Sequence, residues 1–273
     1  MIWLKRNLPK IVISPSCALL VWFVYGFILW TLYISFTKSK ILPNYKFWGI
    51  DQYFRLWSMD RWHVSVSNLF IYTSLFLILC ILIGIVLAIL LDQKIRAEGF
   101  LRTIYLYPMA LSFIVTGTAW KWILNPTLGI EKFFIDIGFE NFTFDWLITP
   151  GMSIYTIVIA GVWQSSGFIM AIFLAGLRSV DDEIIKAAKI DGAGVVSIYT
   201  KIILPMMRPV FMSAVVILVH LAIKSYDLVI ALTSGGPGTS SDMPAVFMTQ
   251  FAFHRSRENW RGSDRSDSCR QRR

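Results

Sequence analysis

The sequence predicts an all-α protein in which a bundle of helices crosses a membrane several times. Hydrophobic residues make up 56% of the 273 residues, whereas charged residues make up 16%. The charges gather in short blocks, and long apolar runs separate these blocks. Several runs reach the roughly 20 residues that a helix needs to cross a hydrocarbon core of about 30 Å. This combination is typical of polytopic membrane proteins.

Five apolar segments are long enough to cross the membrane. In chain order they cover residues 17–36, 69–91, 104–124, 153–177 and 210–232. The chain is therefore expected to consist of an N-terminus of residues 1–16, a transmembrane region of residues 17–253 and a tail of residues 254–273. The three cysteines show no CxxC spacing, so the pattern supports neither a disulfide framework nor a zinc site.

Basic residues flank these segments unevenly. The blocks before the first segment, after the second and after the fourth contain Lys5, Arg6, Lys10, Lys94, Arg96, Arg102, Arg178, Lys186, Lys189, Lys201 and Arg208. Because Lys and Arg beside membrane spans stay in the cytoplasm, the N-terminus and residues 178–209 are predicted to be cytoplasmic. The basic loop from Lys38 to Arg61 disagrees with this majority. No basic stripe alternates with aromatic side chains, so the charge does not indicate a nucleic-acid partner.

A polar stretch between the fourth and fifth segments, residues 178–209, predicts a hairpin of two short helices. Ser179 can cap a first helix that begins at Val180, and acidic residues occupy its first turn, where the helix dipole favours them. Gly192 predicts the end of this helix. A second helix follows and is expected to stop at Pro205.

Each predicted helix of the hairpin has an apolar face with helical spacing. The repeating positions are Ile184, Ala187, Ala188 and Asp191 in the first helix and Val195, Ile198, Tyr199 and Ile202 in the second. Two alanines on the first face allow another surface to approach closely. The pattern leaves two interpretations open: a connector that lies on lipid headgroups, or an element that docks to a soluble partner.

Two motifs of this chain resemble a known family. KAAKIDGA followed by IILPMMRP resembles the cytoplasmic EAA loop of binding-protein-dependent importer permeases, in the sugar-importing, maltose-type branch. The matching positions are Ala187, Ala188, Asp191, Gly192, Ala193, Leu204 and Pro205. SYDLVIALTSGGPGTSS resembles the segment that runs from the family's fifth span into the outer loop. The resemblance reaches to about Phe253, and its finer form is to the glucose, mannose and α-glucoside permeases.

The resemblance implies a helix bundle of the ABC importer permease type, in which the hairpin sits in a cleft of an ATPase subunit. The residues expected at that contact are Glu183, Lys186, Ala187, Ala188, Asp191, Gly192 and Ala193. Asp191 and Gly192 could equally serve the fold alone. Lys186 replaces the glutamate that is usual in the family, which puts the usual ion pair in doubt. Glu183, one turn earlier, is a candidate to replace it.

The chain contains no GxxxxGK[ST] phosphate loop, so energy for transport must come from another subunit. The resemblance implies two ATPase subunits, a second permease subunit, an extracytoplasmic sugar-binding protein and a place in the lipid of the bacterial inner membrane. The chain itself is predicted to be neither an enzyme nor a holder of a cofactor or metal. The competing hypotheses are a secondary transporter, which should show inverted repeats that are not evident, a membrane enzyme, and a transport-inactive truncated protein.

Polar residues within the predicted spans are costly in lipid, so they are candidates for a sugar pathway. These candidates are Asn68, Gln164, Ser165, Lys224, Tyr226 and Asp227. Hydrogen-bonding side chains and aromatic rings usually hold a neutral sugar. The simpler interpretations are hydrogen bonds between packed helices for Gln164 and Ser165 and an ion pair on one helical face for Lys224 and Asp227.

The last part of the sequence departs from the family. Gly235-Gly236-Pro237-Gly238 predicts a turn-rich outer loop, which is either a surface for the binding protein or a plain connector. The family continues from there into a final span, whereas arginine-rich sequence follows Phe253 here, and it has no apolar run long enough to cross a membrane. The tail is interpreted as a truncated or frame-shifted end, or as the basic tail of a short variant.

Overall fold

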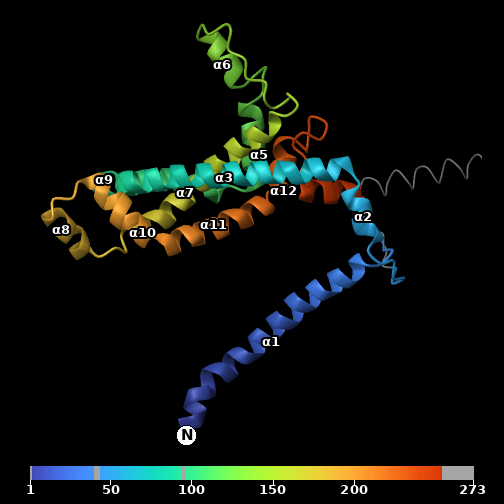
Figure 1. Cartoon of the computed structure of the whole chain (residues 1–273). Coiled ribbons are helices and arrows are strands. Elements are labelled where there is room, and N and C mark those ends of the chain that lie inside the picture. The colour runs from blue at the N-terminus through green and yellow to red at the C-terminus, as the bar shows by residue number, and fades with distance from the viewer. Residues whose placement is uncertain (1, 40–43, 94–95, 254–273) are drawn as a thin grey trace, which may run out of the picture. The chain divides into compact units, whose positions relative to one another are not determined.

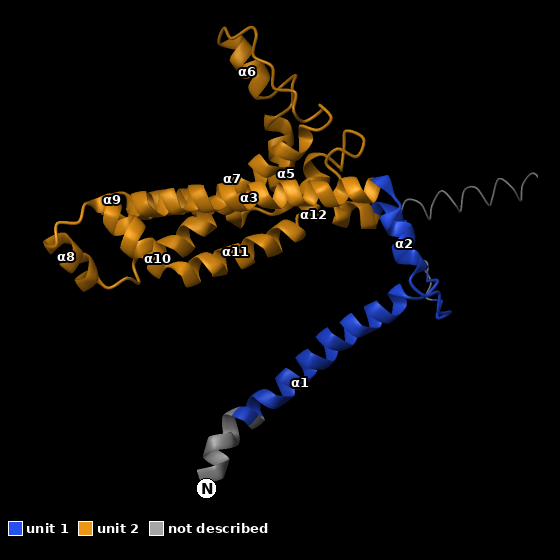
Figure 2. Cartoon of the chain, in the orientation of Figure 1, with its two compact units in different colours: residues 1–60, 250–273 blue, residues 61–249 orange. Residues whose placement is uncertain are grey.

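The computed structural model describes residues 2–39, 44–93 and 96–253, which are mostly helical (Figure 1). Across these ranges the backbone forms no named β-strand, only an isolated bridge between Thr37 and Phe47, so the predicted all-α class is confirmed. The chain divides into two compact units (Figure 2). One contains residues 1–60 and 250–273, and the other contains residues 61–249.

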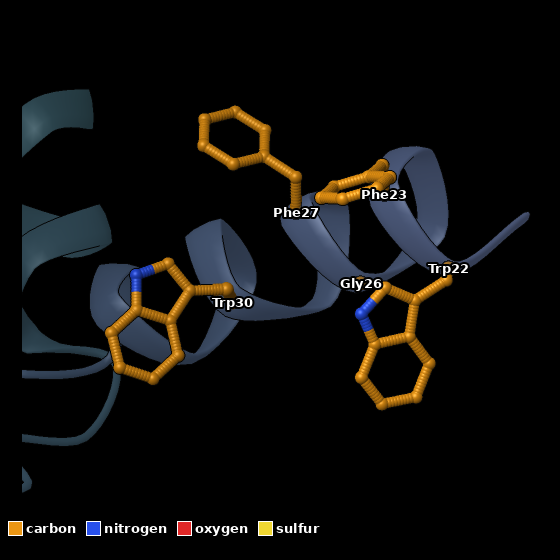
Figure 3. A pocket seen from close by; sticks show the side chains of 5 residues that line it. All are labelled: Trp22, Phe23, Gly26, Phe27 and Trp30. Atoms are coloured by element: carbon orange, nitrogen blue, oxygen red, sulfur yellow. The ribbon is translucent and has the colours of Figure 1, made fainter. Parts of the chain in front are cut away.

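The first unit is built on a single long helix, α1 (Ile2–Ser35), followed by a loop and the short helix α2 (Asp51–Trp57). The part of α1 from Val12 to Ser35 is long and apolar enough to cross a membrane, as the sequence predicts. A shallow hollow on α1 is lined by Trp22, Phe23, Gly26, Phe27 and Trp30 (Figure 3). All of these residues come from one helix and their side chains are exposed, so the hollow is a surface feature and carries no site.

The second unit packs around two long helices, α3 (Asp60–Asp92) and α7 (Ser153–Leu177), and both are long and apolar enough to cross a membrane. Helices in lipid approach each other closely where small residues face the neighbour. At Gly167 of α7, an added Cβ would lie 1.7 Å from the Tyr105 carbonyl oxygen. No side chain fits there, so glycine is what lets α7 meet the helix that contains Tyr105, α4 (Glu98–Leu106).

The third predicted span is not a single straight helix. The chain forms α4 (Glu98–Leu106), a 3-10 turn η1 (Tyr107–Ala110) and α5 (Phe113–Ile123), with a bend of 100° at the break. Pro108 lies in the turn, and Ser112 is extended and caps α5 by accepting a hydrogen bond from the Val115 amide at 3.3 Å. The expectation of one continuous helix over residues 104–124 was therefore wrong.

The fifth predicted span is also broken. Residues 210–232 form α11 (Arg208–Ile223) and α12 (Tyr226–Leu232), which Lys224 and Ser225 separate. The Ser225 hydroxyl is buried at this break and contacts the Met243 sulfur at 3.2 Å. No glycine or proline lies at the break, so the local sequence gives no sign of it. A short helix, α6 (Ile130–Asp136), lies between α5 and α7, and an apolar helix over Pro244–Phe253 ends the described chain.

Candidate functional site

The predicted hairpin is present at one end of the second unit, where α8 (Asp182–Ile190) forms its tip (Figure 1). The Asp181 carboxylate caps this helix by accepting a hydrogen bond from the Glu183 amide at 2.9 Å. Ser179 was the wrong choice of cap, because its hydroxyl donates instead to the Gly176 carbonyl at 2.7 Å. Asp182 and Glu183 occupy the first turn, where their charge suits the helix dipole.

Gly192 ends α8 as the sequence predicts. Its φ of +78° lies in the left-handed region, which favours glycine. The Gly192 amide donates to the Lys189 carbonyl at 3.1 Å, and the Ala193 amide donates to the Ala188 carbonyl at 3.0 Å. This pair of bonds is the Schellman pattern of helix ends. Gly192 and Ala193 thus have a structural role in the turn, and Asp191 lies at the cap position with its side chain exposed.

The second helix of the hairpin extends further than expected. It consists of α9 (Val195–Ile198), a π-helical segment η2 (Tyr199–Ile203) and α10 (Leu204–Met206). Pro205 does not stop it, because the proline lies in the first turn of α10, where a missing amide is tolerated. The axis instead bends by 67° at Met207, before α11.

The hairpin has an inner and an outer face. On the inner face Ala188 is 8% exposed and Ile185 packs against the core, followed by Ile198 of the second helix. The residues expected to share one face of α8 are thus divided. Ala188 faces inward, whereas Ile184, Ala187 and Asp191 are exposed. We call the exposed set the hairpin surface; it comprises Glu183, Ile184, Lys186, Ala187, Ile190, Asp191, Val195 and Val196.

The hairpin surface leaves large apolar side chains uncovered. Ile190 is 86% exposed and Val196 is 76% exposed. Charged side chains at Glu183, Lys186 and Asp191 lie beside them. Together they form an apolar patch with a charged margin, a composition that marks contact surfaces for other molecules.

Polar contacts tie the base of the hairpin to the bundle. Arg178, which follows α7, bonds the Glu98 carboxylate at 2.7 Å and lies 3.8 Å from the Asp92 carboxylate. Tyr199 of the hairpin donates to the same Asp92 at 3.2 Å, and Gln93 donates to the tyrosine oxygen at 3.2 Å. Burial, followed by the neighbouring Asp92 charge, raises the pKa of the Tyr199 hydroxyl, so it remains a donor. The ends of α3, α4 and α7 are thereby joined to the hairpin.

The six candidate pathway residues do not form one cluster. Asn68 lies near the outer loop, where its amide donates to the carbonyls of Ser240 at 3.1 Å and Asp242 at 3.0 Å. Gln164, 3% exposed, donates to the Leu111 carbonyl at 2.8 Å at the break between η1 and α5. Ser165, the next residue in the sequence, is also buried. The Gln164 bond is of the kind that joins packed segments, and the role of these residues in a sugar pathway stays a prediction.

Lys224, Tyr226 and Asp227 lie at the break between α11 and α12. Lys224 and Asp227 are exposed, and Tyr226 is partly buried against the core. Within the described part of the chain no ion pair joins Lys224 to Asp227, because the break removes the shared helical face that the sequence suggested. In the same ranges, no three His, Cys, Asp or Glu side chains are grouped to hold a metal ion.

Comparison with known proteins identifies the class that this bundle and hairpin define. A family model described as "Binding-protein-dependent transport system inner membrane component" matches residues 80–255. A probable ABC transporter permease protein of Pyrococcus horikoshii is 39% identical over 90% of this chain and 86% of its own length. The xylose/arabinose import permease protein XacH of Haloferax volcanii is 35% identical over 84% of this chain and 73% of its own.

A solved ABC transporter contains a chain with the same fold. The crystal structure of a bacterial ABC transporter involved in the import of the acidic polysaccharide alginate contains a chain that matches with a TM-score of 0.77. The match is 20% identical and covers 93% of this chain and 87% of that one. The molecule is therefore a multi-pass membrane permease of the ABC importer type. It belongs to the family of binding-protein-dependent transport system inner membrane components, which confirms the resemblance seen in the sequence.

Proposed function

We propose that this permease imports a sugar, and that the hairpin surface docks on a cytoplasmic ATPase subunit. In the proposed assembly two ATPase subunits drive this chain and a second permease, and an extracytoplasmic sugar-binding protein delivers the substrate. The N-terminus and residues 178–209 lie on the cytoplasmic side of a bacterial inner membrane. The tail of residues 254–273, expected to be an altered end, lies outside the described residues, so the proposal does not involve it.

The observation that carries the docking proposal is the exposure of Ile190, Val195 and Val196 on a tethered, charged hairpin. Fully burying an isoleucine or valine side chain is worth about 1.5 to 3 kcal/mol, so a partner that covers several of them gains substantial affinity. A bilayer surface would also cover apolar side chains. Glu183 and Asp191 argue against it, because acidic groups gain nothing from anionic lipid headgroups.

One further observation supports a pathway shared with a second permease. Lys224 at the break of the fifth span and Asp227 in the first turn of α12 are both exposed. Charged groups at membrane depth face other protein or a water-filled cavity, because exposure to lipid is costly. A second permease that packs on this side would provide such surroundings.

The sugar assignment rests on relatives. The trehalose/maltose transport system permease protein MalF of Thermococcus litoralis is 30% identical over 86% of this chain and 79% of its own length. XacH, whose name specifies xylose and arabinose, is a second sugar permease in the same range of identity. Polar side chains and the ring of Tyr226 at the break between α11 and α12 suit a neutral sugar.

Purification of the complete importer from membranes through a tag on this chain tests the proposal. We expect two ATPase subunits and a second permease to be recovered with it. In vesicles, ATP hydrolysis should rise when sugar-loaded binding protein is added, and sugar should accumulate. Recovery of the chain without an ATPase subunit, or uptake that continues without ATP, would contradict the proposal.

A further inference from the structure

The outer loop, residues 233–243, is hydrogen-bonded to two helices and within itself. It connects α12 to the helix Pro244–Phe253. Ser241, Asp242 and Met243 are buried, whereas Gly238 and Thr239 are exposed. The loop therefore has a buried base and an exposed tip, and the charged and polar groups around the base decide how firmly that tip is held.

The base is held by an ion pair that the sequence does not suggest. The Asp242 carboxylate, 1% exposed, lies 2.6 Å from Arg61 Nε in the first turn of α3. Its other oxygen, Oδ1, is buried and has no hydrogen-bond partner among the described residues. The buried charge thus depends on Arg61, because removing one partner of a buried pair leaves the other uncompensated.

Asn68, two turns further along α3, holds the backbone of the same loop. Its side-chain amide donates to the carbonyls of Ser240 and Asp242 and lies 3.5 Å from that of Thr239. Three carbonyls that converge on one amide fix the local course of the chain. Arg61 and Asn68 thus hold the loop at its charged side chain and at its backbone.

Hydroxyl groups complete the attachment. Ser153, at the start of α7, shares a hydrogen bond of 3.1 Å with Ser240. The Ser241 hydroxyl donates to the Gly236 carbonyl at 2.7 Å and lies 2.8 Å from the Thr233 hydroxyl, so the loop is also closed on itself. The tip around Gly238 is therefore presented by a base that is bound to two helices and to its own turn.

We propose that Arg61, Asn68 and Asp242 are positioning residues that hold the outer loop ready to receive the extracytoplasmic binding protein. This inference rests on the proposed function. A loop that is already ordered loses little conformational freedom when a partner binds, so pre-ordering raises affinity without adding a contact. Loss of the Arg61–Asp242 pair frees the tip and weakens docking, while the ATPase subunits, which bind elsewhere, remain attached.

The test uses the complete importer in lipid vesicles and measures ATP hydrolysis as a function of the concentration of sugar-loaded binding protein. In the Arg61→Gln variant, the concentration for half-maximal stimulation should rise by about tenfold or more. Hydrolysis without binding protein and hydrolysis at saturation should stay unchanged. Arg55→Gln, which removes the same charge from an exposed position in α2, is the matched control and should leave all three quantities unchanged.

Two further variants guard against simple misfolding. The charge exchange Arg61→Asp with Asp242→Arg should recover much of the lost sensitivity. Thr239→Lys, at the exposed tip, leaves the base intact and should also raise the half-maximal concentration. An unchanged half-maximal concentration in Arg61→Gln or Thr239→Lys would overturn the inference, and so would a loss of maximal rate alone. A wild-type importer that shows no stimulation at all would instead refute the proposed function.

Discussion

The outer loop and the hairpin are the two polar elements of the same bundle, and they are stabilised in different ways. The outer loop is held by polar contacts within the chain, from Arg61, Asn68 and Ser153, although the buried Asp242 Oδ1 has no partner among the described residues. The hairpin packs Ala188 and Ile198 inward and has ion pairs between partly exposed groups at its base, whereas its large apolar side chains at Ile190 and Val196 remain uncovered. The first element is complete in the single chain, and the second needs another molecule to cover it.

This difference predicts two kinds of mutational effect. Changes in the outer loop should affect the stability of the chain, because buried contacts are lost. Changes on the hairpin surface should leave the chain intact and affect assembly, because exposed side chains contribute little to an isolated fold. Four variants test this contrast.

The largest effect is expected for Arg61→Leu. It leaves the Asp242 carboxylate buried without its cation, which costs about 3 to 5 kcal/mol. The melting temperature of the purified chain should fall clearly, as measured by the loss of helical circular dichroism on heating. A melting temperature equal to that of the Arg55→Leu control would show that the outer loop is not stabilised as described.

Ile190→Glu should give the next largest effect. The side chain is 86% exposed, so the fold of the single chain should not change. A charge in place of an apolar contact should lower the affinity for the ATPase subunit by at least about tenfold. Recovery of that subunit during purification measures the change. Asn141→Glu, an exposed position before α7, adds the same charge and should have no effect; equal recovery in both variants would argue against docking at the hairpin surface.

Arg178→Gln should have a moderate effect on transport. The variant removes the ion pairs to Asp92 and Glu98 that tie the hairpin to the bundle. Exposed pairs contribute about 0 to 1 kcal/mol each, so the melting temperature should change little. ATP hydrolysis should persist, but sugar accumulated per ATP should fall several-fold, because motion of the hairpin is transmitted less well. Parallel loss of hydrolysis and transport would indicate a different role for Arg178.

Lys186→Glu should give the smallest effect. It restores the residue that is usual in the family at an exposed position of the hairpin surface. An exposed ion pair is worth up to about 1 kcal/mol, so stimulated hydrolysis should change by no more than about fivefold. Lys189→Glu makes the same change of charge at another exposed position, about one turn further along α8. Similar changes of stimulated hydrolysis in both variants would mean that the overall charge of the hairpin determines the rate. Position 186 would then have no specific contact.

Much of the fold could be predicted from local sequence. Apolar length alone predicts the first, second and fourth spans. Gly192 predicts the left-handed turn that ends α8. Pro108 is a local sign of the break within the third span, whereas no glycine or proline marks the break within the fifth. The geometry of the two breaks could not be predicted. They depend on contacts from distant segments, such as the bond from Gln164 to the Leu111 carbonyl and the contact between Ser225 and Met243.

The candidate site was predictable to a similar extent. The hairpin and its coupling residues follow from helical spacing and from the family resemblance. Asp181 caps α8 because the Ser179 hydroxyl is already bonded to the Gly176 carbonyl at the end of α7. This bond is visible only in the folded chain. Arg61 and Asp242 are separated by 181 positions, so no spacing rule connects them.

We expect an ATPase subunit to bind the hairpin surface inside the cell. Site-specific crosslinking from an Ala187→Cys variant, with the native cysteines replaced, tests it most directly in intact membranes. We expect an adduct that contains the ATPase subunit, and no reaction at position 187 with a membrane-impermeant thiol reagent added outside. Labelling of position 187 from the outside, without any such adduct, would contradict it.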